Sequence, residues 1–168
     1  MKNFLKEWVA PIIIAVVAAL LIKQFLFFNI IVPSESMYPT IKPNDTIIVS
    51  RVYRPQNLKR GDIVVFYSKE LKESLIKRLI GISGDEVLIK DDGSVFINGN
   101  RLNEPYVYQN GGISGTYKVP KDSYFFLGDN RGNSKDSRYW VNHYISKSDI
   151  KGKGLFILFP FKRAGILH

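Results

Sequence analysis

The sequence predicts a mostly β protein, in which a single N-terminal transmembrane helix precedes an antiparallel, barrel-like β domain. Three observations lead to this fold class. Residues 9–32 are almost continuously apolar. Short apolar or alternating runs then recur between turn residues, as in β proteins. No stretch after residue 40 shows a sustained period of 3.6 residues, which a second long helix would need.

The apolar N-terminal segment fits a membrane-spanning helix. A helix over residues 8–28 would be roughly 31 Å long, close to a hydrocarbon core of about 30 Å. Lys23 interrupts the run in its last third, where a lysine can extend its amine outward to the interface. Pro11 falls in the first turns, where a missing N–H is tolerated. The stretch has no polar face, so it is not a buried amphipathic helix.

A removable signal peptide has a similar basic start and apolar middle, so it is the main alternative for this segment. Cleavage would need small residues, whereas residues 25–35 read FLFFNIIVPSE. We therefore expect an uncleaved anchor. Lys2 and Lys6 precede the span and are nearly balanced by Lys42 and Arg51 after it, so the charge rule favours a cytoplasmic N-terminus only slightly.

The rest of the chain reads as strands separated by turns. Turn chemistry is clear at residues 91–93 (DDG) and 98–100 (NGN). Residues 103–118 are expected to form a long loop or a loosely paired excursion. Together these features predict one antiparallel, barrel-like β domain of about 140 residues. The expected strands cover residues 45–53, 62–67, 75–82, 86–90, 94–98, 124–129 and 154–159.

Composition narrows the possible function. The formal net charge is +9, but the basic residues are scattered and no helix is placed to enter a nucleic-acid groove. Attraction to anionic lipid is the favoured explanation, since each nearby Lys or Arg contributes about 1 kcal/mol. The chain has no cysteine, which excludes disulfides, a thiol nucleophile and a zinc–thiolate site. Phosphate-binding glycine patterns are absent, and Arg131 replaces an oxygen ligand in the only EF-hand-like stretch, so no metal or cofactor is expected.

Two places in the sequence could carry chemistry. VPSESMYPT (32–40) puts two hydroxyls on a constrained bend directly after the apolar segment. A capping turn, a polar hinge, and a nucleophile with an oxyanion donor all fit that bend. His143 and His168 are the two histidines, and neither has neighbours that indicate a catalytic triad.

Lys77 and Arg78 lie in an apolar strand, LIKRLIGI, so alternation forces both cations among apolar side chains on opposite faces. Arginine stays charged and needs a carboxylate partner. Lysine can lose its charge on desolvation and can then accept a proton near neutral pH. The alternative is that Lys77 extends to solvent from an edge strand. A serine nucleophile with a lysine base is a known variant of the serine triad.

Four segments occur in the order and character of the sequence boxes of type I signal peptidases: VPSESMYPT, RGDIVVF, KRLIGISGDEV and GDNRGNSKDSR. With the apolar segment included, the chain resembles this family over nearly its whole length, in the short Gram-positive form. The resemblance implies a membrane-anchored serine endopeptidase that removes signal peptides from secretory preproteins after small residues in an Ala-x-Ala pattern. It also implies a cytoplasmic segment 1–8, a transmembrane helix 9–28 and an extracytoplasmic peptidase domain 29–168, in a single-pass plasma-membrane protein.

The resemblance also assigns roles to individual residues. Ser36 corresponds to the nucleophile and Lys77 to the general base. Ser34 corresponds to a hydroxyl that stabilises the oxyanion, and Ser134 to a serine that orients the lysine amine, although a capping turn also fits Ser134. Structural support would come from Arg78 with Asp129 and from Asp136 with Arg138. Ile30, Val32, Pro33, Leu75 and Ile76 would shape pockets for small substrate residues, or simply belong to the core.

This chain departs from the family pattern in two places. The glycine that commonly follows the DSR motif after an aromatic residue is missing, and Ser83 replaces the usual proline of a turn. Three other functions compete: a self-cleaving repressor-type peptidase, which would carry a DNA-binding domain at the N-terminus; an inactive membrane-tethered binding module; and a DNA-binding protein.

Overall fold

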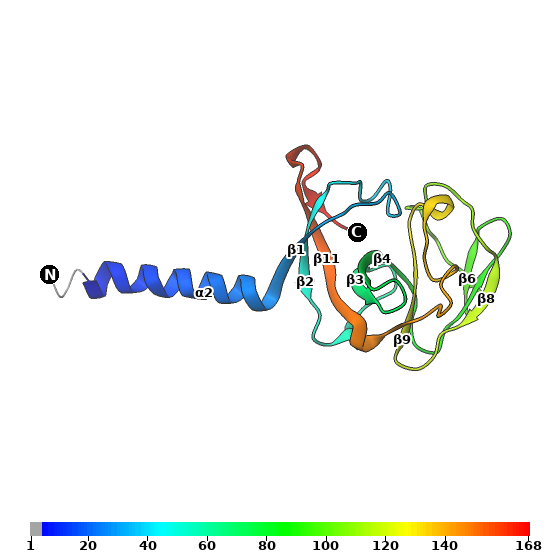
Figure 1. Ribbon diagram of the computed structural model, residues 1–168, viewed down its shortest axis with the longest axis horizontal. Helices are drawn as coiled ribbons and strands as arrows, with labels where there is room; N and C mark the ends of the chain where they lie inside the picture. The colour runs from blue at the N-terminus through cyan, green and yellow to red at the C-terminus, as the bar shows by residue number, and fades with distance from the viewer. Residues whose placement is uncertain (1–4) are drawn as a thin grey trace.

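The computed structural model describes residues 5–168 and combines one long helix with a β domain (Figure 1). A π-helical turn, η1 (Leu5–Val9), leads into α2 (Ala10–Leu26), which projects away from the β domain. No side chain of α2 is buried, and Glu7–Leu26 is long and apolar enough to cross a membrane. Of the expected cytoplasmic segment 1–8, residues 1–4 lie outside the described residues.

The helix ends at Leu26, earlier than the expected residue 28. Phe27 and Phe28 instead begin β1 (Phe27–Ile31), in which Phe27 is opposite Ser50 and Phe28 opposite Val49 of β2. Backbone pairing with β2 therefore takes these residues out of the helix. The anchor passes directly into the first strand, and the Tyr53 hydroxyl donates a hydrogen bond to the Phe25 carbonyl at this junction.

The larger sheet is antiparallel and has eight strands. It follows the order β1-β2-β11-β3-β4-β9-β10, with β12 paired to β11. Four antiparallel steps separate β1 from β4, so these two strands run in the same direction. Besides β1, its strands are β2 (Thr46–Arg51), β3 (Ile63–Ser68), β4 (Glu73–Gly81), β9 (Ser123–Leu127), β10 (Ile145–Ser146), β11 (Ile150–Phe159) and β12 (Gly165–Ile166).

The smaller sheet lies at the end of the domain farther from the helix (Figure 1). Its order is β7 (Asn100–Arg101), β6 (Val95–Ile97), β5 (Glu86–Ile89) and β8 (Gly115–Lys118). Strand β8 falls at the end of the expected loop 103–118, where Tyr117 pairs with Val87 and is buried. Short 3-10 turns are η2 (Pro55–Asn57), η3 (Arg131–Asn133), η4 (Lys147–Asp149) and η5 (Phe161–Arg163).

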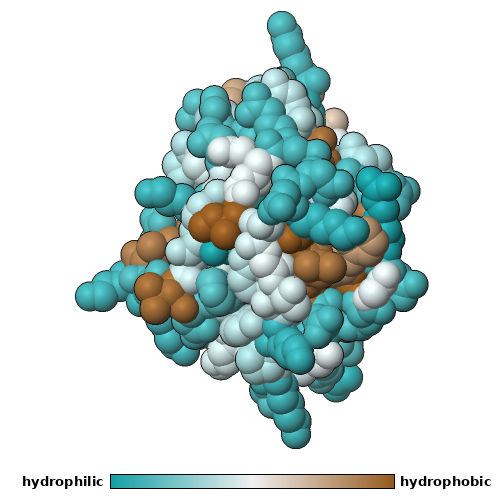
Figure 2. Space-filling view, turned by 90° about the vertical axis from the view of Figure 1, so that its right-hand side faces the viewer, coloured by the Kyte–Doolittle hydropathy of each residue, from teal (hydrophilic) through white to brown (hydrophobic). Residues whose placement is uncertain are grey.

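The predicted fold class is confirmed, and the two sheets are open rather than closed into one barrel. All seven strands expected after residue 40 are present, with small shifts of their ends. The face of the domain that points away from the helix is largely hydrophilic, with separate apolar patches (Figure 2).

Strand β4 takes part in all three clusters of buried apolar side chains. Ile76 packs in a cluster with Val32 and Met37, Leu79 in a second cluster and Ile80 in a third. The residues of β4 are exposed at the start of the strand and buried from Ile76 onward. Each core therefore restrains β4, and Lys77 and Arg78 lie in the middle of the restrained part.

Gly152 of β11 lies where three strands come close together. A Cβ atom there would lie 2.5 Å from the Ser50 carbonyl oxygen and 3.0 Å from the Phe28 ring. Because a backbone oxygen cannot rotate away, we expect Gly152→Ala to lower the free energy of unfolding by about 1–3 kcal/mol. Denaturant unfolding of the detergent-solubilised protein measures this effect. Gly165→Ala is the matched control, since its nearest neighbour would be 3.8 Å away; equal stability of the two variants would contradict the packing argument.

Candidate active site

Ser36 lies in the bend between β1 and β2, and the bend is fixed at both ends. The Val32 amide donates to the Asp45 carbonyl at 3.0 Å, and the Asn44 amide donates to the Val32 carbonyl at 2.8 Å. Met37 points into the core and is fully buried. The bend is thus pinned by backbone bonds and by a buried side chain, and Ser36 itself is only 6% exposed.

Lys77 lies against this bend. Its side chain is 3% exposed, and its Nζ atom donates a hydrogen bond to Ser36 Oγ. Burial lowers the pKa of the Lys77 amine from its ordinary 10.5 to about 8. The carboxylates of Asp136, Glu73 and Asp129 act in the opposite direction. Burial prevails, so a substantial fraction of this amine is neutral at mildly alkaline pH.

The two hydroxyls of the bend lie together. Ser34 Oγ is 3.2 Å from Ser36 Oγ, and either can donate the hydrogen bond between them. The carbonyl oxygen of Ser36 accepts the Asn130 amide at 3.1 Å, which ties the bend to the glycine-rich segment 128–138. Within residues 5–168, the Ser36 amide N–H donates no hydrogen bond to another backbone group.

Ser134 is buried near this bend, but its hydroxyl has no hydrogen-bond partner among the described residues. It lies beside Gly128, where an added Cβ would collide with both the Ser134 side chain and the Ser36 carbonyl oxygen. Gly128 therefore allows the segment to approach the bend closely. The structure places Ser134 near Ser36, and its bond to the lysine amine stays a prediction.

Arg78, the cation next to Lys77, is neutralised by a carboxylate. Its guanidinium donates to both oxygens of Asp129, Nε at 2.8 Å and Nη2 at 2.7 Å, and both residues are buried. Thr40, at the end of the serine bend, donates to the same carboxylate at 2.6 Å. The Tyr106 ring lies against the guanidinium, 3.8 Å from ring centroid to Cζ. The pair thus joins β4, the bend and the segment after β9.

Asp136 and Arg138 form a second buried pair. Arg138 donates to Asp136 through Nε at 2.8 Å and Nη2 at 2.9 Å. The Gly128 amide donates to Asp136 at 3.0 Å, and Arg138 Nη2 donates to the Arg131 carbonyl at 2.8 Å. These bonds hold the two ends of the glycine-rich segment 128–138 together.

A third pair of buried side chains, Glu104 and Arg131, was not predicted from the sequence. Arg131 Nη2 lies 2.5 Å from Glu104, and its Nε donates to the Gly128 carbonyl at 3.0 Å. The Tyr106 hydroxyl also donates to Glu104, at 2.9 Å. Glu104 lies in the stretch that the sequence suggested was a loop, where an acidic residue looks like ordinary surface. Two aromatic residues close behind it, in EPYVY, were the available indication that this stretch is packed.

An apolar groove leads to the hydrogen-bonded residues Ser36 and Lys77, which are called the dyad below. It has a volume of about 440 Å³ and lies between β1 with the following bend and the first half of β4. The groove brings together all five residues that the resemblance assigned to substrate pockets. Its walls include Ile30, Val32, Pro33, Leu75 and Ile76, together with Ser34, Glu73 and Lys77.

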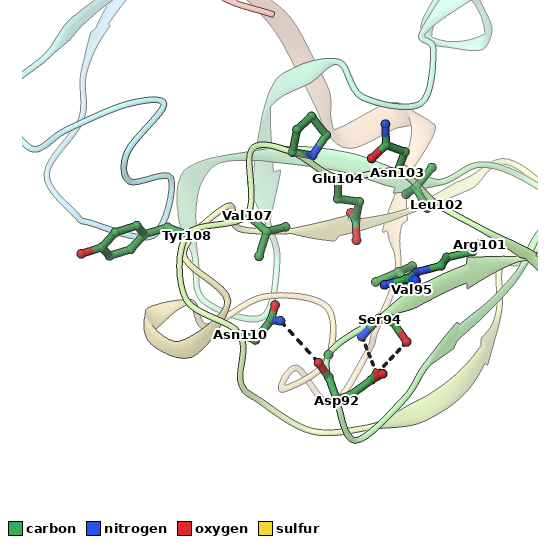
Figure 3. Close-up of a pocket in the computed structure, with 12 residues that line it drawn as sticks. Asp92, Ser94, Val95, Arg101, Leu102, Asn103, Glu104, Val107, Tyr108 and Asn110 are labelled. Atoms are coloured by element: carbon green, nitrogen blue, oxygen red, sulfur yellow. Dashed lines mark hydrogen bonds between the residues drawn. The ribbon is translucent and has the colours of Figure 1, made fainter.

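A second cavity lies away from that groove, between the smaller sheet and the segment after β7 (Figure 3). It has a volume of about 610 Å³ and a largely polar wall that includes Arg101, Glu104 and Tyr108. Ser94 donates to Asp92 through its amide at 2.9 Å and its hydroxyl at 2.6 Å. None of the predicted site residues lines this cavity.

His143 contacts a backbone carbonyl outside the site, with Nδ1 2.6 Å from the Ser137 carbonyl oxygen.

A serine hydroxyl hydrogen-bonded to a buried amine, on a β scaffold, fits the class of serine peptidases. Comparison with known proteins specifies the class further. The family described as signal peptidase, peptidase S26, matches residues 5–159. The chain belongs to this signal peptidase family, and it is a serine peptidase that acts on signal peptides.

The relatives cover nearly the whole chain. A signal peptidase I P of Bacillus subtilis subsp. natto is 42% identical over 95% of this chain and 91% of its own length. Signal peptidase I T of Bacillus subtilis strain 168 is 42% identical over 95% of this chain and 88% of its own length. A crystal structure of a signal peptidase I from Enterococcus faecalis is 33% identical, has a TM-score of 0.51, and covers 58% of this chain and 96% of that one.

Breaking the buried pair of Arg78 and Asp129 should be costly to stability. Removing the carboxylate in Asp129→Ala leaves a guanidinium that cannot lose its charge, and we expect a loss of about 3–5 kcal/mol in the free energy of unfolding. Denaturant unfolding followed by circular dichroism measures it. Lys147→Ala is the control, because it breaks an exposed pair with Asp122 at 2.9 Å and should leave stability unchanged. Equal midpoints for the two variants would show that the buried pair is dispensable.

Proposed function

We propose that this protein is a membrane-anchored endopeptidase that cleaves secretory preproteins after small residues in an Ala-x-Ala pattern, with Ser36 as nucleophile and neutral Lys77 as general base. The observation that carries the proposal is the hydrogen bond between the buried Lys77 amine and the Ser36 hydroxyl. An amine with a pKa of about 8 can take up a hydroxyl proton near neutral pH, whereas an ordinary lysine amine cannot.

The chemistry then proceeds in two steps. Lys77 accepts the Ser36 proton as Oγ attacks the scissile carbonyl, and the resulting ammonium protonates the leaving amine. Water, activated by the same amine, hydrolyses the acyl ester on Ser36. The Ser34 hydroxyl and the Ser36 amide N–H stabilise the oxyanion, and the position of the hydroxyl beside Ser36 Oγ supports this role. Ser134 would orient the amine, and the pairs of Arg78 with Asp129 and of Asp136 with Arg138 hold the surrounding backbone.

Substrate binds as an added strand in the groove. β1 is the end strand of its sheet, and β9 pairs with β4 only from Arg78 onward. Among the described strands, the edges of β1 and of residues 73–77 therefore have no partner on the groove side. An extended peptide can bond to such edges while alternate side chains enter pockets. Ile30, Leu75 and their apolar neighbours leave room for small side chains such as alanine.

The anchor fits this reaction. Helix α2 passes directly into β1, so the groove begins only a few residues after the apolar span. With the N-terminus in the cytoplasm, residues 29–168 lie on the extracytoplasmic face of the plasma membrane, beside the point where a signal helix emerges. Attachment to the bilayer raises the effective concentration of substrate without new contacts. The net charge of +9 favours contact with anionic lipid.

Cleavage of an Ala-x-Ala preprotein by the detergent-solubilised protein tests the proposal. We expect Ser36→Ala and Lys77→Ala to lower kcat/KM by at least about 10³-fold while remaining folded by circular dichroism. Ser34→Ala should lose about 10²-fold, as expected for one oxyanion donor. Lys118→Ala, an exposed lysine of β8, is the control and should match wild type.

Cleavage by Ser36→Ala at the wild-type rate would refute the role of Ser36 as nucleophile. A wild-type protein that cleaves no such preprotein would favour the inactive binding module instead.

A further inference from the structure

Glu73 lies in the substrate groove at the end farther from the dyad. It is the first residue of β4 and is exposed, whereas Lys77, four residues later in the same strand, is buried beside Ser36. Both residues line the groove. They lie on the same face of the strand, because successive side chains alternate. A carboxylate therefore lies in the apolar groove on the membrane side of the reacting serine.

This carboxylate is not neutralised by the protein. The ion pairs formed within residues 5–168 do not include Glu73, and no hydrogen bond there uses its side chain. Lys151 Nζ, an amine close to this end of β4, donates to the Ser74 hydroxyl at 2.7 Å and lies over the Tyr67 ring. This amine is thus engaged by Ser74 and Tyr67, and it forms no ion pair with Glu73 among the described residues. Glu73 remains a free negative charge for a ligand.

The direction of the strands indicates which part of a substrate meets Glu73. β1 and β4 run the same way, and both lead from the anchor side toward the dyad. Four residues of strand correspond to about 13 Å, and a strand bonded alongside advances by the same amount per residue. If the residue whose carbonyl is attacked lies beside Lys77, the fifth residue before the cleaved bond lies beside Glu73.

We infer that Glu73 is a specificity-determining residue, which favours a cationic side chain and disfavours an anionic one about five residues before the cleaved bond. The assignment rests on the proposed function, since it presupposes that the groove holds the signal-peptide side of the substrate. The interaction is between exposed charges, so its expected size is a preference of about twofold to fivefold in kcat/KM between Lys and Glu at that position.

A charge-swap experiment tests this inference. Three preproteins that differ only in carrying Lys, Gln or Glu at the fifth residue before the cleaved bond are compared on wild type, Glu73→Gln and Glu73→Lys. Wild type should prefer Lys over Gln over Glu, Glu73→Gln should show no preference, and Glu73→Lys should reverse the order. The preference of wild type should shrink at 1 M salt, because exposed charges are screened.

Glu86→Lys is the matched control, an exposed glutamate of β5 on the distal sheet, and it should keep the wild-type order. Unchanged ratios in the Glu73 variants would overturn the inference. So would an equal change of rate on all three preproteins, because that outcome means that Glu73 acts only through the nearby Lys77 amine. Failure of wild type to cleave any of the three would overturn the proposed function itself, and this assignment with it.

Discussion

Burial of the Lys77 amine against Ser36 is the constraint on which the rest of the site depends. A charged amine loses its hydration in such a place, so the neutral form becomes accessible, and the neutral form is the one that can act as a base. The free-energy cost of removing this amine from water is tolerated because packing holds β4 in place. Ile76, Leu79 and Ile80 anchor this strand in three separate cores.

The next residue along the chain, Arg78, is also a buried cation, but its charge is neutralised rather than lost. Arg78 keeps its charge and is paired with Asp129, which also binds Thr40 of the serine bend. The ion pair therefore does more than neutralise a cation, since it holds β4 and the bend together at the place where the Lys77 amine bonds to the Ser36 hydroxyl. Buried pairs of this kind contribute little net stability but are costly to break.

Much of the fold and part of the site could be predicted from the sequence. Strands alternate or run apolar between turns. A Lys–Arg pair inside an apolar strand indicates that the arginine needs a carboxylate partner and that the lysine can lose its charge. The end of the helix was harder, because Phe27 and Phe28 are apolar enough for a membrane, and only pairing with β2 shows that they belong to a strand. Contacts between residues far apart in the sequence could not be predicted, because no local pattern connects Glu104 to Arg131. The need for glycine at position 128 likewise appears only when the Ser36 carbonyl is seen beside it.

The proposed chemistry depends on the protonation state of the Lys77 amine. The most direct measurement is an NMR titration of the Lys77 side chain in the full-length protein in detergent, assigned by comparison with Lys77→Arg. We expect a midpoint near pH 8 for Lys77, well below the ordinary lysine value of about 10.4. A midpoint for Lys77 at or above 10 would mean that the amine is charged throughout the neutral range, and that Ser36 is not activated by a lysine base.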